Sequence, residues 1–479
     1  MNDLQFILDT AAEKRPVIDR MTQMIWDYAE PDYGEYQSCD YLVSVLEQEG
    51  FTVEKGVGGI PTAFAARYGH GHPVIGITAE YDSLPGLSQE RGNPFRSPLP
   101  GHTHGHGCGH NALGSGAVGA AILVRHWLEE SGTEGTIVCY GTPAEENGFG
   151  KTFMLKAGCF RELDACFTWH PRPYNASPAY CHVGYLVAKF TFSGVSAHAA
   201  ASPEKGRSAL DACELMNVGV NYLREHVIDK ARMHYAYLDA GGQAPNVVQS
   251  HAVLLYYLRA PKIAYSKYLL ERVSDIARGA ALMTGTQVQI EQVGGMSDYI
   301  PNPVMCQTLS DAYLATGAPD FDEEDYAVAR RFVAALSPEQ QAEVLRTGAA
   351  ANGVSAEEFA GKPLVTSIIP FDPAQQNTIM TGSTDFGDVS YAVPCAQLNA
   401  ATCIPGTSMH TWQHTAMVGT SIGNKAAFAA AKGIAYGCVK VFRRPELCEE
   451  AKKQLLAATH GEYESPIPDG IMPGEGITL

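Results

Sequence analysis

The sequence lacks a long uninterrupted run of apolar residues, and no stretch reaches the ~18 apolar residues that a membrane-spanning helix needs. The first residues, MNDLQFILDTAAEKRPVIDR, mix apolar side chains at helical spacing with charges, and they lack the apolar core of a signal peptide. These two absences favour a cytoplasmic protein that has no membrane partner.

Basic residues are outnumbered by acidic ones: 34 Lys and Arg stand against 52 Asp and Glu, which gives a net charge of −18. Nucleic acids and anionic membranes bind clusters of Lys and Arg, so we expect neither as a partner. The 12 cysteines are scattered singly, which favours reduced and mostly buried thiols. Cys108 is the exception, because only one glycine separates it from His110, and both side chains can bind a metal ion.

The chain has 479 residues, too many for one ordinary core, so we expect two domains. One pattern repeats in the first part: an apolar strand, a polar residue at its carboxyl end, then a helix. Strands are predicted at residues 74–79 and 136–140 and in DACFTWHPRP, where the strand ends at His170. In an open α/β sheet such strand ends share one edge. That edge would bring together Asp82, Cys108, His110, Glu145, Glu146 and His170, although each alone also fits a cap, a turn or a structural hydrogen bond.

A different pattern begins near residue 185. A strand and a long helix come first, NVVQSHAVLLYYLRAP supplies one or two strands, and a helix and a last strand, TQVQIEQVGG, follow. The order β-α-β-β-α-β is that of a ferredoxin-like module. We therefore expect residues 185–299 to form an inserted domain, and residues 320–361 to form a helical surface insertion.

Adjacent glutamates suit two different tasks. If Glu145 and Glu146 are helical, their side chains point about 100° apart, so Glu146 can bind a metal ion while Glu145 takes a proton from a water. A thiolate, imidazoles and a carboxylate suit Zn²⁺ or Mn²⁺ better than Ca²⁺ or Mg²⁺, which prefer oxygen ligands. These residues therefore favour a metal-dependent hydrolase.

Six motifs together resemble the metal-dependent peptidase and amidohydrolase family that includes carboxypeptidase G, aminoacylases and plant auxin-conjugate hydrolases. They are HGCGHN, GTPAEE, TWHP, GVSAHAAASPEKGRSALDA, GGQAPNVV and GTSMHTW. The resemblance extends over nearly the whole chain. It implies a zinc-peptidase-like α/β catalytic domain, with a mixed sheet and helices on both faces, formed by residues 1–184 and 300–479. It also implies that residues 185–299 are a ferredoxin-like lid through which a homodimer forms.

The same resemblance assigns roles to ten residues. It implies two divalent ions, Mn²⁺ or Zn²⁺, with Glu145 as the general base and His198 polarising the scissile carbonyl from the dimer partner. Asn246 and Arg259 would hold the substrate's carboxylate, and Asp82 would orient a ligand. The implied ligands are Cys108, His110, Glu146, His170 and His410.

Some residues keep more than one interpretation. His102 and His104 extend the histidine cluster as loop residues, and His106 is expected to position its neighbours rather than bind an ion. His414 lies one turn beyond His410 and is an alternative to it. Asp385 and Asp388 fit caps or supporting residues equally well.

The expected reaction is hydrolysis of the amide in N-acyl or N-aroyl amino acids. The first candidate substrate is p-aminobenzoyl-glutamate, and an indole-acetyl amino acid is the second. A dipeptidase, a subunit that needs a related partner chain, and a non-catalytic metal-binding protein remain alternatives.

Overall fold

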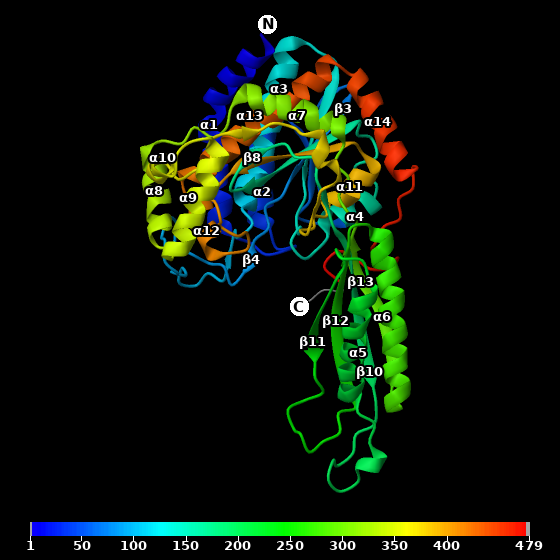
Figure 1. Ribbon diagram of the computed structural model, residues 1–479. Coiled ribbons are helices and arrows are strands. Elements are labelled where there is room, and N and C mark those ends of the chain that lie inside the picture. Colours follow the sequence, from blue (N-terminus) through cyan, green and yellow to red (C-terminus); the bar gives the residue numbers. More distant parts are fainter. Residues whose placement is uncertain (1, 476–479) are drawn as a thin grey trace. The chain divides into compact units, whose positions relative to one another are not determined.

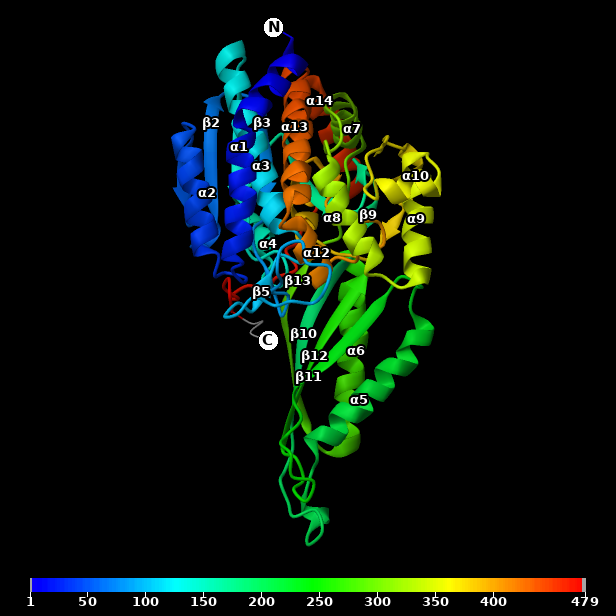
Figure 2. The ribbon, with the colours of Figure 1, turned by 90° about the vertical axis from the view of Figure 1, so that its left-hand side faces the viewer.

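A computed structural model describes residues 2–475, and the chain divides into two compact units (Figures 1 and 2). The first unit comprises Met1–Tyr180, Pro301–Thr378 and Val389–Tyr463, and the second comprises Cys181–Ile300, Ile379–Asp388 and Glu464–Leu479. The segment expected as an inserted domain lies in the second unit. That unit also takes in residues 379–388 and 464–479, which the sequence analysis assigned to the first domain.

The first unit contains an eight-stranded mixed sheet with the order β1-β2-β6-β3-β7-β16-β8-β14. Strands β6, β3, β7 and β16 run parallel in its centre, and β1 and β2 form an antiparallel pair at one edge. Strands β3, β6 and β16 are buried along their whole length, as expected for parallel strands covered on both faces. The strands are β1 (Thr52–Lys55), β2 (Phe64–His70), β3 (Val74–Ala79), β6 (Gly135–Gly141), β7 (Ala165–Arg172), β8 (Asn175–Ala176), β14 (Ile368–Ile369) and β16 (Cys395–Ala401). A separate two-stranded pair is formed by β4 (Leu84–Pro85) and β5 (His104–Gly105).

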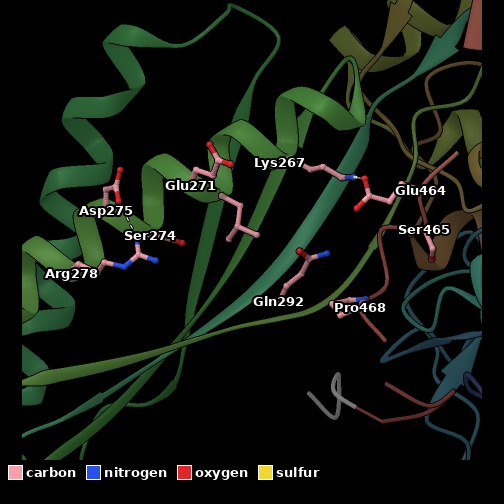
Figure 3. A pocket seen from close by; sticks show the side chains of 10 residues that line it. Lys267, Glu271, Ser274, Asp275, Arg278, Gln292, Glu464, Ser465 and Pro468 are labelled. Atoms are coloured by element: carbon pink, nitrogen blue, oxygen red, sulfur yellow. Dashed lines mark hydrogen bonds and ion pairs between the residues drawn. The ribbon is translucent and has the colours of Figure 1, made fainter. Parts of the chain in front are cut away.

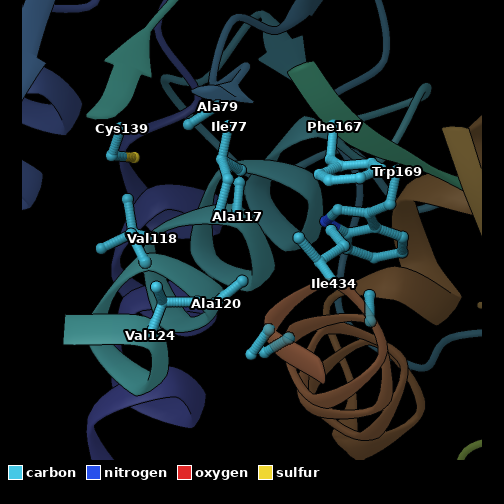
Figure 4. Packing of buried hydrophobic residues seen from close by; sticks show 14 of the residues in the cluster. Ile77, Ala79, Ala117, Val118, Ala120, Val124, Cys139, Phe167, Trp169 and Ile434 are labelled. Carbon is cyan, nitrogen blue, oxygen red and sulfur yellow. The ribbon is translucent and has the colours of Figure 1, made fainter. Parts of the chain in front are cut away.

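Helix α3 (His110–Ser131) lies at the centre of the hydrophobic core, between β3, α1 and α13 (Figure 4). Its small residues permit close packing: a Cβ at Gly114 would lie 2.5 Å from the Glu80 carbonyl oxygen. The other helices of the unit are α1 (Asp3–Tyr28), α2 (Tyr36–Gln48), α4 (Gly150–Lys156), α7 (Pro303–Thr316), α8 (Glu323–Ala334), α9 (Pro338–Asn352), α10 (Ala356–Gly361), α12 (Trp412–Val418), α13 (Ser421–Arg443) and α14 (Glu446–Thr459). Helices α8 to α10 confirm the helical segment predicted for residues 320–361.

The second unit has a four-stranded antiparallel sheet with the order β11-β12-β10-β13, against which α5 and α6 pack. The elements are β10 (Gly184–Ser193), α5 (Ala209–Leu223), β11 (Arg232–Asp239), β12 (His251–Ala260), α6 (Ile263–Thr284) and β13 (Gln287–Met296). The predicted β-α-β-β-α-β order is therefore present. The expectation of a possible second strand within NVVQSHAVLLYYLRAP was wrong, because only β12 forms there and its partner β11 comes earlier. Strand β11 is an edge strand with mostly exposed side chains, so it carries no clear apolar pattern.

Two outlying segments complete the second unit. Strand β15 (Ile379–Met380) pairs in parallel with β9 (Cys181–His182), and α11 (Phe386–Ala392) begins in this unit. Lys267 of α6 forms an ion pair with Glu464, near the end of the chain (Figure 3). Gln292 of β13 donates a hydrogen bond to the Pro466 carbonyl. These contacts join residues 379–388 and the described residues 464–475 to the second unit.

None of the described helices is both long enough and apolar enough to span a membrane.

Candidate metal centre and active site

Seven predicted site residues lie in the first unit, around the carboxyl edge of its parallel strands. One follows β3, two follow β6, and one lies in β7, two residues before that strand ends. Two stand at the start of α3, and one lies between β16 and α12. In that order they are Asp82, Glu145, Glu146, His170, Cys108, His110 and His410. The parallel strands place their ends at one edge, as the repeated sequence pattern predicted.

Two groups of potential ligands share Cys108. In the first group are Cys108, His110 and His170, and in the second are Cys108, Glu146 and His410; within each group the ligand atoms all lie within 4.8 Å of one another. The Cys108 Sγ lies 3.4 Å from His170 Nε2, and His410 Nε2 lies 3.3 Å from Glu146 Oε2. A thiolate common to both groups can bridge two ions.

Both imidazoles of the first group are oriented for binding through Nε2. The Nδ1 of His110 lies 2.7 Å from Asp82 Oδ1, and the Nδ1 of His170 lies 2.8 Å from the Pro171 carbonyl oxygen. Since these oxygens accept hydrogen bonds, each Nδ1 carries a hydrogen, and Nε2 is the ring atom left to face a metal ion. Metal-binding histidines are typically held in this way.

Buried polar atoms at the site also fit a cation. Within residues 2–475, His110 Nε2 and Glu146 Oε1 are buried without a hydrogen-bond partner. Burial raises the pKa of the Cys108 thiol to about 12 and that of Glu146 to about 7. Burial opposes the ionisation of this thiol and this carboxyl group. A bound divalent cation would favour their ionised forms, the thiolate and the carboxylate, and so would stabilise the converging ligand atoms. The residues present therefore fit Zn²⁺ or Mn²⁺.

Asp82 connects the two ligand groups. It is almost fully buried; its Oδ1 pairs with His110, and its Oδ2 accepts the Glu146 backbone N–H at 2.9 Å. Burial opposes its ionisation, but the charge and hydrogen bond of His110 outweigh burial and lower the pKa of Asp82. The predicted orienting position of Asp82 agrees with these contacts.

The two glutamates lie in a turn, not in a helix. Ala144, just before them, has a left-handed φ of 59°, and α4 begins only at Gly150. The condition of a helical pair therefore does not hold, but the turn still separates the two side chains. Glu146 Oε2 faces His410, and Glu145 Oε2 lies 4.0 Å from His110 Nε2.

Four further residues belong to this region, and sequence reasoning gave them no role. Glu35 accepts a hydrogen bond from the Ala144 N–H at 2.8 Å, which holds the glutamate turn. Burial, reinforced by the charge of Asp82, raises the pKa of Asp32 to about 9 and of Glu35 to about 8. Lys151 forms a buried ion pair with Glu80, whose Oε1 lies 2.7 Å from Nζ. Of these four residues, only Glu80 could be noticed in the sequence, because it belongs with Asp82 to an acidic pair that follows β3.

The structure separates the histidines by their contacts. His410 has a left-handed φ of 61° and points Nε2 at Glu146. His414 is buried, with Nδ1 2.9 Å from the Gly107 carbonyl oxygen and Nε2 2.9 Å from the Thr402 hydroxyl, so both its nitrogens have partners. His106 is buried and bonds the Ile25 carbonyl through Nε2, which suits a positioning residue.

The remaining predicted residues belong to the second unit. His198 is exposed, and its Nδ1 accepts hydrogen bonds from the N–H groups of Ala200 and Ala201, which leaves the proton on Nε2. Asn246 is its neighbour, since the Asn246 carbonyl accepts the Ala199 N–H at 2.9 Å.

Arg259 lies on β12 in the same unit. It donates a hydrogen bond to the Ser383 hydroxyl at 2.8 Å and stacks over Tyr185 at 4.4 Å. Asp388, beside this region in sequence, accepts hydrogen bonds from the N–H and hydroxyl of Ser297. Asp388 is thus a structural residue of the unit.

Comparison with known proteins identifies the family of this chain. Residues 76–415 match peptidase family M20/M25/M40. The chain belongs to this family. It is therefore a metal-dependent enzyme that hydrolyses amide bonds, as the resemblance implied.

Individual relatives cover the whole chain. It is 40% identical to one of the subunits of p-aminobenzoyl-glutamate hydrolase of Escherichia coli, over 98% of both chains. It is 29% identical to Xaa-Arg dipeptidase of Mus musculus, over 94% of this chain and 90% of that one. Among solved structures, a Bacillus subtilis protein described as a dinuclear metal-binding peptidase of the M20 family superposes with a TM-score of 0.58 at 17% identity, over 90% of this chain and 99% of that one. That structure supports the predicted fold.

Proposed function

We propose that this member of the M20/M25/M40 family hydrolyses the amide bond of N-aroyl or N-acyl amino acids, with p-aminobenzoyl-glutamate as its first candidate substrate. The donor set carries the proposal: Cys108 belongs to two groups of ligand atoms, and Glu145 belongs to neither of these groups but is grouped with Glu80 and His110 beside them. The full-length similarity to the Escherichia coli hydrolase subunit supports the aroyl substrate.

Two divalent ions, Zn²⁺ or Mn²⁺, would be held by the two groups, one by Cys108, His110 and His170 and the other by Cys108, Glu146 and His410. When bound, such ions polarise a carbonyl and lower the pKa of a bound water.

Glu145 would transfer the protons, and His198 would stabilise the negative charge that develops on the carbonyl oxygen. Glu145 would accept the proton of the attacking water and deliver it to the leaving amine nitrogen. The His198 Nε2–H is a donor suited to the developing oxyanion, and its fixed tautomer supports this role. Arg259 is suited to the carboxylate of the released amino acid, because a guanidinium binds a carboxylate through two hydrogen bonds.

The test is a panel of amides incubated with protein stripped of metal and reloaded with Zn²⁺ or Mn²⁺. The panel contains p-aminobenzoyl-glutamate, indole-acetyl-aspartate and several dipeptides. We expect metal-dependent cleavage of p-aminobenzoyl-glutamate, and its loss in Glu145→Ala. Cleavage of dipeptides alone would replace the proposed substrate class.

A dipeptidase is the second candidate, favoured by the full-length similarity to Xaa-Arg dipeptidase of Mus musculus. A carboxyl-terminal arginine and a glutamate both present an α-carboxylate, so the residue that holds this group does not separate them. Dipeptides ending in arginine therefore belong in the panel.

We also propose a cytoplasmic homodimer that forms through the second unit. Its α5 and β11 expose large apolar side chains, among them Val218, Tyr222 and Tyr235, which are 50%, 78% and 45% exposed. Exposed apolar surface of this kind favours a protein interface. The 12 free thiols suit a reducing compartment. Light scattering would show the dimer, and full activity that appears only with a second, related chain would indicate a partner subunit instead.

A further inference from the structure

Arg172 is the last residue of strand β7, two residues beyond His170. Of the eight residues of β7, His170 and Arg172 are half-buried and the other six are buried. Side chains two positions apart on a strand share one face, and the Cα atoms that carry them lie about 6.6 Å apart. Arg172 therefore projects from the same face of β7 as His170, one step further along the carboxyl edge of the sheet.

The backbone of Arg172 is fixed, but its guanidinium has no partner. The Arg172 carbonyl accepts the Thr402 N–H at 2.8 Å, and the residue pairs with Ala401 in the parallel register of β7 and β16. Within residues 2–475, the guanidinium forms no ion pair with a carboxylate and donates no hydrogen bond to another residue. Burial, together with the charges of His110 and Arg172, lowers the pKa of His410. An unpaired positive charge thus acts on the proposed metal centre.

A guanidinium at this place is unfavourable unless an anion binds to it. An arginine side chain stays protonated at physiological pH, and the ions of the proposed centre would add further positive charge. Like charges that are partly removed from water repel each other, so stability alone would favour a neutral or acidic residue here. Residues that oppose stability in this way are typical of functional sites. The missing partner is therefore expected to be an anionic group of the substrate.

The proposed substrate carries two carboxylates. p-Aminobenzoyl-glutamate has an α-carboxylate, which Arg259 is proposed to bind, and a second carboxylate at the end of the glutamate side chain. Each charge that leaves water must be paired, and a guanidinium binds a carboxylate through two parallel hydrogen bonds. A dipeptide that ends in arginine would instead bring a second guanidinium towards Arg172, and the two like charges would repel each other.

We infer that Arg172 binds the side-chain carboxylate of the amino acid that is released, so that the enzyme acts on conjugates of glutamate or aspartate and not on dipeptides that end in arginine. The inference rests on the proposed function and deepens it, because it names the class of amino acid. Arg172 is a substrate-binding residue that selects this class and takes no part in the cleavage of the amide.

The experiment compares two substrates that differ only in the group in question, p-aminobenzoyl-glutamate and p-aminobenzoyl-glutamine. We measure kcat and KM for both with the metal-loaded full chain and with Arg172→Met and Arg172→Lys. Arg172→Met should lower kcat/KM for the glutamate conjugate about 10- to 100-fold, mainly through KM, and leave the glutamine conjugate nearly unchanged. Arg172→Lys should recover part of the loss, because it restores the charge but not the two parallel hydrogen bonds.

Arg161 provides the matched control. It is an exposed arginine of the same unit that precedes the amino end of β7, so it lies at the opposite end of the strand from Arg172. Arg161→Met removes the same charge from the molecule, and kcat/KM for both conjugates should stay at the parent's values. Bound metal, measured by mass spectrometry, should be the same in all variants and shows that each has kept its site.

The outcomes separate this inference from the proposed function. Equal losses for the two conjugates in Arg172→Met, or no loss for either, would overturn the inference. A parent chain that cleaves neither conjugate would refute the proposed function, and calorimetric binding of the same two conjugates then decides the inference by itself. Tighter binding of the glutamate conjugate that is lost in Arg172→Met supports the inference, and equal binding of both conjugates by the parent chain overturns it.

Discussion

Replacing Asp82 by Asn should weaken metal binding although it changes a single atom. Both carboxylate oxygens of Asp82 accept an N–H, one from His110 Nδ1 at 2.7 Å and one from the Glu146 backbone at 2.9 Å. An asparagine offers one acceptor and one donor, so one of these contacts is lost. If the amide donates to Nδ1, the hydrogen of His110 moves to Nε2 and blocks its lone pair. If it faces the Glu146 N–H instead, two donors oppose each other.

The expected loss follows from the loss of one orienting contact. Removing the group that orients a metal-binding histidine typically costs 10- to 100-fold in affinity, or about 1.4–2.7 kcal/mol. Chelator competition measures the affinity, and kcat/KM for p-aminobenzoyl-glutamate at saturating metal measures the remaining activity.

Asp164 offers a control at the other end of β3, where a single carboxylate oxygen makes both contacts. Its Oδ2 accepts the Val74 N–H at 2.7 Å and lies 2.8 Å from His72 Nδ1. Asp164→Asn should lower stability and leave metal affinity unchanged. Equal zinc affinity in Asp82→Asn and the parent chain would refute the assigned role of Asp82.

Three further predictions concern catalysis, substrate binding and stability. Glu145→Gln should lower kcat by about 10²- to 10⁴-fold while both ions still bind; loss of metal along with activity would make Glu145 a ligand instead. Arg259→Ala should raise KM for carboxylate-bearing amides by about 10- to 100-fold, the loss of one charge-assisted contact, whereas Arg232→Ala, opposite it on β11, should leave KM unchanged; equal effects of the two would mean a general electrostatic role. Glu49→Gln should lower the free energy of unfolding by about 1 kcal/mol at pH 7, because a hydrogen bond from His126, together with Lys14, lowers the pKa of Glu49 from 4.5 to about 2. Since this stabilisation is present above pH 4.5 and lost as the pH falls towards 2, the difference between variant and parent in urea titrations should shrink over that range; a constant difference would contradict it.

The sequence allowed the site to be predicted wherever a residue's position follows from a strand end. Asp82, Glu146 and His170 lie at or just beyond the carboxyl ends of three parallel strands, so their convergence could be deduced from the order of elements alone. His410 and its neighbour His414 could not be separated by the same logic. The difference between them depends on tertiary hydrogen bonds. Both ring nitrogens of His414 are hydrogen-bonded, one to the Gly107 carbonyl and the other to the Thr402 hydroxyl.

Other parts could not be predicted because their signal is absent from local patterns. Lys151 looks like an ordinary surface residue of a short helix, and only the packed structure shows that it is buried against Glu80. Strand β11 was not predicted because its side chains are mostly exposed. An edge strand of this kind shows no alternation of apolar and polar residues in the sequence. Segment 379–388 joins the second unit through pairing with β9, a long-range contact.

The division of the chain has a consequence for the order in which the protein can fold during synthesis. The backbone passes between the two units after residues 180, 300, 378, 388 and 463, so neither unit is a continuous stretch of sequence. Domains that are continuous can fold as they leave the ribosome, amino-terminal first. Here the second unit acquires Glu464 and Pro466, the partners of Lys267 and Gln292, only after residues 301–463 have been synthesised. Neither unit is therefore complete before the ribosome has passed residue 463, and the two units finish folding late and close in time.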